Sequence, residues 1–86
     1  MPYIYIEPKN INSVRNVMRI VCGLRKMRSV RRGTIINTEV NGFDYWTIIV
    51  AVDDDEVKSD VECWLNSNQE LINIYGETEN YFYRRK

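Results

Sequence analysis

The sequence predicts an α+β domain of the ferredoxin-like class, with the element order βαββαβ. Three observations predict it: a short alternating run near the start, two segments with helical periodicity, and two β-rich runs joined by Asn41-Gly42. Two βαβ units of this kind form an antiparallel sheet with both helices on one face. The chain of 86 residues is enough for one domain, and we expect that domain to span 1–86.

The first strand is predicted over residues 3–6, where tyrosine and isoleucine alternate before Pro8. Proline cannot continue a central strand, so the strand ends there. Because successive side chains of a strand point to opposite faces, Tyr3 and Tyr5 share one face and the isoleucines share the other. We expect the isoleucines to face the helices and the tyrosines to lie on the open face.

A helix is predicted from Asn12 or Ser13, either of which is a suitable N-cap, to residues 25–27. Its apolar residues recur at helical spacing; they are Val14, Val17, Ile20, Val21 and Leu24. Beyond this point the helical phase breaks, and residues 28–33 are expected to form a basic connector.

The strongest local signal is the Asn41-Gly42 pair between the β-rich runs 34–40 and 43–52. Asn-Gly is the preferred two-residue turn of a hairpin, since both residues tolerate positive φ. That turn sets Thr38 opposite Tyr45 and places both on the same face as Thr47. The other face of the second run carries a continuous apolar row, which we assign to the core: Trp46, Ile48, Val50 and Val52.

Four acidic residues, 53–56, precede the second helix, and we interpret them as its cap and as a complement to its dipole. Helical spacing continues over residues 57–65, and its apolar face includes Trp64. Both tryptophans, Trp46 and Trp64, are therefore expected to be buried. A strand follows over residues 71–75, then a turn over 76–80, with 81–83 as an additional C-terminal strand.

Two short patterns resemble the RNA-recognition-motif (RRM) family. Ile4-Tyr5-Ile6 is an aliphatic–aromatic–aliphatic triplet in the first strand, and Gly42-Phe43-Asp44-Tyr45 places alternating aromatics after a glycine. Small RRM-like proteins occur in large DNA viruses. The resemblance implies an RRM-like fold in which these aromatic rings stack on the bases of single-stranded nucleic acid.

The second pattern can be aligned in two ways. In the first alignment Asn41 stands where the family has a basic residue. In the second, made from the end of the strand, Thr47 and Ile49 occupy the aromatic positions.

The charges are sorted along the chain although the total is zero. Residues 1–32 hold eight bases and one acid, residues 33–83 hold eleven acids and one base, and residues 84–86 add three bases. Two interpretations follow: the basic and acidic elements neutralise each other within the fold, or a basic face meets a polyanion or an acidic partner.

The residues for most catalytic chemistry are missing from the sequence. There is no histidine, and Cys22 and Cys63 are too far apart for a CxxC site. No glycine-rich phosphate loop occurs. We therefore expect no enzyme activity, no metal, no cofactor and no small-molecule substrate, and we expect the two cysteines to be reduced and buried in helices.

We expect a non-enzymatic protein–protein interaction module, or a small structural subunit of a larger assembly such as a viral one. It would dock another chain or its own copy through the open aromatic face or a sheet edge. The alternative is an RRM-like protein that binds single-stranded RNA or DNA. The expected contact residues on the open face are Tyr3, Tyr5, Tyr45, Thr38 and Thr47, and the expected basic contacts are Arg28, Arg31, Arg32, Arg84, Arg85 and Lys86.

The sequence also bears on where the protein resides. No apolar run approaches the roughly 20 residues that span a bilayer. The first seven residues lack the charged start and apolar middle of a signal peptide. We expect an intracellular protein, cytoplasmic or nuclear, or one packaged in a virion, with no membrane partner.

Overall fold

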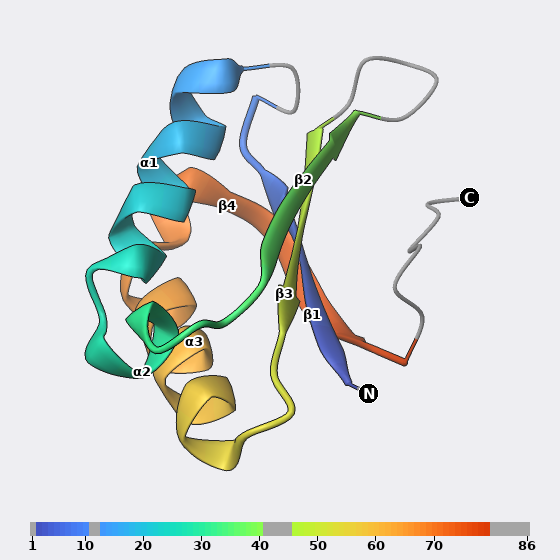
Figure 1. Ribbon diagram of the computed structural model, residues 1–86. Helices are drawn as coiled ribbons and strands as arrows, with labels where there is room; N and C mark the ends of the chain where they lie inside the picture. Colours follow the sequence, from blue (N-terminus) through green and yellow to red (C-terminus); the bar gives the residue numbers. More distant parts are fainter. Residues whose placement is uncertain (1, 11–12, 41–45, 80–86) are drawn as a thin grey trace.

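The computed structural model describes residues 2–10, 13–40 and 46–79. These form an antiparallel sheet of four strands in the order β2-β3-β1-β4, with the helices on one of its faces (Figure 1). The elements in chain order are β1 (Tyr3–Pro8), α1 (Val14–Arg25), α2 (Arg28–Arg31), β2 (Ile36–Val40), β3 (Trp46–Ala51), α3 (Asp55–Ser67), η1 (Gln69–Leu71) and β4 (Ile72–Thr78). The α+β class is confirmed, and the topology is compatible with a ferredoxin-like fold.

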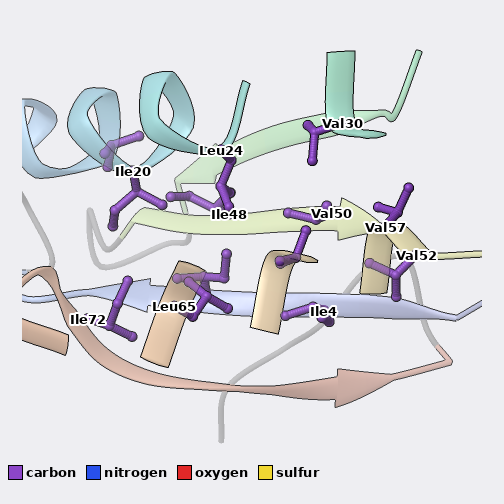
Figure 2. Packing of buried hydrophobic residues seen from close by; sticks show 13 residues of the cluster. Ile4, Ile20, Leu24, Val30, Ile48, Val50, Val52, Val57, Leu65 and Ile72 are labelled. Atoms are coloured by element: carbon purple, nitrogen blue, oxygen red, sulfur yellow. The ribbon is translucent and has the colours of Figure 1, made fainter. Parts of the chain in front are cut away.

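The hydrophobic core lies between the sheet and the helices (Figure 2). Ile4 and Ile6 of β1 point into it, so the predicted orientation of this strand is confirmed. Burying an aliphatic side chain of this size contributes roughly 1.5–3 kcal/mol. The remaining members of the cluster are Val17, Ile20, Leu24, Val30, Ile48, Val50, Val52, Val57, Val61, Leu65 and Ile72.

The ends of the two long helices have clear local causes. Ser13 caps α1 by accepting a hydrogen bond from the backbone N–H of Asn16. Asp54 caps α3 in the same way, with its carboxylate 2.7 Å from the backbone nitrogen of Glu56. Asp55 and Glu56 occupy the first turn, where negative charge complements the helix dipole. The interpretation of the acidic run as a cap is confirmed.

The segment predicted as a basic connector is partly helical. Helix α1 ends at Arg25, within the predicted range, but Arg28–Arg31 forms the short helix α2. Ser29 and Val30 of this helix are buried, and Val30 belongs to the core cluster. The arginines around them, Arg28, Arg31 and Arg32, are exposed.

The predicted register between the two hairpin strands is wrong. Thr38 pairs with Ile48, where Tyr45 was predicted, and Val40 pairs with Trp46. Among the described residues β2 ends at Val40 and β3 begins at Trp46, and these two residues pair with each other. The predicted Asn41-Gly42 turn itself lies outside the described residues. Because the register shifts by an odd number, Thr38 moves to the face that carries the helices.

The last described strand is longer than predicted. β4 runs through Gly76 to Thr78, where a turn was expected to begin at residue 76. Gly76 lies opposite Tyr5 of β1, and a Cβ on Gly76 would come within 2.8 Å of the Tyr5 hydroxyl. Glycine therefore allows the tyrosine ring to cross over β4. The expected additional strand over 81–83 lies outside the described residues.

Candidate interaction surfaces

The sheet face opposite the helices, called the outer face, holds three of the predicted contact residues. Tyr3 and Tyr5 lie on it from β1, and Thr47 lies on it from β3, since each alternates with a core residue. Thr38 lies on the opposite face because of the register change described above. Tyr45 lies outside the described residues. The structure therefore brings together two of the three predicted tyrosines with one of the two threonines.

The outer face is packed more closely than a bare stacking platform would be. Ile49, which lies opposite Tyr5, is only 1% exposed, and Glu7 is 4% exposed. The ring of Tyr5 lies against Gly76. The outer side chains of β3, at Thr47, Ile49 and Ala51, are not aromatic. The central strands thus present rings from β1 alone.

The predicted basic contacts divide between two places. Arg28, Arg31 and Arg32 are exposed on and after α2. Arg32 approaches Glu56 of α3, with 3.5 Å between nitrogen and carboxylate oxygen. The hydroxyl of Ser29 donates a hydrogen bond of 2.6 Å to Asp60. These contacts fasten α2 to α3. The tail residues Arg84, Arg85 and Lys86 lie outside the described residues.

Sequence reasoning missed a surface on the β2 side of the molecule. Five large hydrophobic side chains are exposed among the described residues, namely Val14, Met18, Ile35, Val40 and Ile74. Ile35 and Val40 lie just before and at the end of β2, whereas Ile74 lies in β4 at the other edge of the sheet. The place of Val14 and Met18 depends on how α1 is turned.

Helix α1 is oriented by its contact with α3. A Cβ on Gly23 would come within 2.2 Å of the Trp64 ring, so this flank of α1 faces α3. At 3.6 residues per turn, Val14 and Met18 lie on the opposite flank. Helix α1 contacts β3 and β1, and β2 is the next strand beyond β3 (Figure 1). The flank of Val14 and Met18 is therefore directed toward β2.

We call the resulting surface the β2 side. It comprises Val14 and Met18 of α1, Val40 of β2, and Ile35, together with the half-buried Trp46 opposite Val40. Strand β2 is also an edge of the sheet. Natural edge strands are commonly protected by lysine, proline or a bulge. β2 contains one charged residue, Glu39, and neither lysine nor proline.

The other edge of the sheet is joined to its neighbouring helix. The hydroxyl of Tyr75 in β4 donates a hydrogen bond of 2.7 Å to Asn66 of α3. Lys58 of α3 forms a salt bridge with Glu77 of β4. The hydrogen bond and attraction from Glu77 raise the pKa of Lys58 above its ordinary value.

Two predictions of burial need correction. Trp46 and Trp64 are half-buried, each packing against the core cluster from its margin. Cys22 and Cys63 are unpaired and exposed. Both cysteines lie on the outward side of their helices, because the buried residues of α1 and α3 occupy the opposite turn positions.

The remaining features of the described residues are few. Those residues contain no group of three or more acidic or cysteine side chains that could hold a metal ion. Their helices include none that is long and apolar enough to cross a membrane. A groove of about 630 Å³ lies between α1 and α3, with Trp64 in its wall.

No protein family, curated protein or solved structure matches this chain.

Proposed function

We propose that the protein is a non-enzymatic protein–protein interaction module, or a small structural subunit, that docks another chain on its β2 side. The observation that carries the proposal is the exposure of Val14 and Met18 on the flank of α1 directed toward β2, with Val40 exposed at the end of that strand and Ile35 just before its start. Exposed apolar residues grouped on one side of a protein mark interaction sites more often than scattered single residues do.

The edge strand supplies the second part of the docking site. A protein segment that adds to β2 as a further strand gains backbone hydrogen bonds along the edge. Its side chains on the helix face would contact Val40 and the α1 flank, and those on the outer face would contact Ile35. Main-chain bonds would give affinity, and the apolar contacts would select the sequence of the segment.

A second candidate is an RRM-like protein that binds single-stranded nucleic acid. Its support is the pair Tyr3 and Tyr5 on the outer face, together with the exposed arginines of α2. Stacking on an aromatic ring contributes about 1–3 kcal/mol per base. The absence of aromatic side chains from the outer face of β3 weighs against it, so we rank it below the protein-binding function.

The test is affinity capture of the tagged protein from its native source, with and without nuclease, at low and high salt. A protein partner is expected to stay bound after nuclease and at high salt, because an apolar interface responds little to ionic strength. The captured protein is then purified separately, and it must re-form a stoichiometric complex. Loss of the partner on nuclease treatment, with direct binding of an oligonucleotide, would favour the RRM-like function.

A further inference from the structure

The layer of helices is divided into a basic half and an acidic half. Residues 14–32, which include α1 and α2, contain seven bases and no acid. Residues 53–67, which include α3 and its cap, contain six acids and one base. The bases are Arg15, Arg19, Arg25, Lys26, Arg28, Arg31 and Arg32, and the acids are Asp53, Asp54, Asp55, Glu56, Asp60 and Glu62.

The two halves lie side by side on the same face of the sheet. Trp64 of α3 packs against Gly23 of α1, and the two helices run in opposite directions (Figure 1). Among the described residues, one salt bridge joins the halves, between Arg32 and Glu56 at 3.5 Å, and both its side chains are more than half exposed. An exposed ion pair of this kind contributes little to the stability of the fold. Most of the opposite charge therefore remains on the surface.

A second copy of the chain fits this division of charge. A two-fold axis that runs parallel to the helices, in the interface and between them, places α1 of one copy over α3 of the other. The same operation places α3 of the first copy over α1 of the second, so both halves meet opposite charge at once. An axis perpendicular to the helices would instead place like charges together, which selects the first arrangement.

A nucleic acid fits the layer less well than a second copy does. A polyanion would be attracted to the α1–α2 half and repelled by the adjacent α3 half. A copy of the chain has no net charge, so association of two copies builds up no overall repulsion. The neutral total and the local separation of charge thus point to the same partner.

A groove of mixed character lies where the axis would pass. Its volume is about 630 Å³, and its lining includes the apolar Trp64, Met27 and Leu71 and the charged Arg19, Lys26 and Glu70. Trp64 is half-buried. Half-exposed tryptophans near the centre of an interface are frequent energetic anchors, with charged residues around them.

We infer that the helix layer is a self-association surface, on which two copies pack with α1 and α2 of each over α3 of the other. This inference goes beyond the proposed function, because it uses the outward, charged side of the helices, whereas the proposed docking site uses the flank of α1 directed toward β2 and the edge strand. The two surfaces can therefore be tested separately.

The experiment uses two charge-reversed variants of the full chain. The basic-half variant is Arg19→Glu with Lys26→Glu, and the acidic-half variant is Asp55→Lys with Glu62→Lys. Sedimentation equilibrium measures the mass of each protein at up to about 0.5 mM, at about 50 mM and about 500 mM salt. Circular dichroism establishes that each variant is folded. Lys9→Glu, an exposed reversal outside the helices, is the matched control.

The wild type and the control are expected to dimerise at low salt, and their dissociation constants should be at least about tenfold higher at high salt. Each charge-reversed variant alone should dimerise more weakly than the wild type, because the reversals lower the net charge of the basic half from +7 to +3, or that of the acidic half from −5 to −1. An equal mixture of the two variants should form a heterodimer, because reversal on both sides restores attraction.

Several results would overturn the inference. One is a wild type that stays monomeric at low salt and the highest concentration. Another is a dimer that neither pair of reversals weakens, or folded variants that fail to form the heterodimer. A dimer that dissociates on Met18→Lys with Val40→Lys, and not on charge reversal, would place self-association on the β2 side instead. Binding of a single-stranded oligonucleotide by a monomeric wild type, lost in the basic-half variant, would assign the basic half to nucleic acid.

Discussion

The β4 edge of the sheet is joined to α3 by the Tyr75–Asn66 hydrogen bond and the Lys58–Glu77 salt bridge. The β2 edge carries exposed apolar residues at Ile35 and Val40, beside the exposed Val14 and Met18 of α1. Both edges belong to the same sheet and border the same core. On the proposed function, the β4 edge is completed by side chains of the chain itself, and the β2 edge receives a second molecule.

The largest expected effect is on the free energy of unfolding, and it comes from the buried side of helix α1, whose other side is exposed. Leu24 is completely buried and Met18 is 54% exposed on the same helix. Leu24→Ala should lower the free energy of unfolding by about 2–5 kcal/mol, since it leaves a cavity. Met18→Ala should change it by less than about 0.5 kcal/mol. Urea unfolding measures both, and a comparable loss from Met18→Ala would show that Met18 supports the fold.

The second effect concerns binding of the protein partner. Replacing Met18 and Val40 together by lysine should weaken the complex by about 2 kcal/mol or more, which is a loss of roughly 30-fold in affinity. Lysine at these positions places charge on the apolar surface and on the strand edge. Titration calorimetry with the purified partner gives the affinity. Ile74→Lys, at the other edge, is the control, and an equal loss from it would remove the distinction between the edges.

The third effect tests the contact that orients α1. Gly23→Ala should lower the free energy of unfolding by about 1–3 kcal/mol, because the new Cβ would collide with the Trp64 ring. Alanine is the better helix former, by roughly 0.5–1 kcal/mol, so propensity alone predicts the opposite sign. Cys22→Ala, at the adjacent exposed position, is the control. Stabilisation by Gly23→Ala would mean that α1 and α3 are not in close contact.

The smallest effect is the pH dependence of the salt bridge at the β4 edge. The pKa of Lys58 is raised by Glu77 from an ordinary value of 10.5. The stabilisation is therefore fully present below that value, and it is lost as the pH rises through the higher pKa of the folded state. The difference in stability between the wild type and Glu77→Gln should shrink above about pH 10.5. A difference that persists at higher pH would assign the effect to packing.

The sequence predicted the elements that depend on local patterns. Alternation placed Ile4 and Ile6 in the core, and the acidic run before α3 marked its cap at Asp54. The spacing of Val17, Ile20 and Leu24 identified the buried stripe of α1. Each of these depends on residues within one or two turns, which the sequence records directly.

Predictions that depend on the pairing of distant residues were less successful. The assumed two-residue turn fixed a register that the structure shifts by an odd number of residues, which moved Thr38 to the other face. Val14 was assigned to the buried stripe but is exposed. The sequence does not record where a helix lies on the sheet, and that placement decides which residues at the border of its apolar stripe are covered. Cys22 and Cys63 could have been assigned correctly, since each lies out of phase with the buried positions of its helix.

The central claim is that the β2 side, and not the β4 edge, receives a protein partner. Val40 and Ile74 permit a matched test, because both are 48% exposed and lie in opposite edge strands. A photo-crosslinking amino acid is placed at one position or the other in the full chain, which is then irradiated in its native cell. Crosslinks to one protein from position 40, and none above background from position 74, are expected. Equal crosslinking from both positions, or crosslinking from position 74 alone, would contradict the claim.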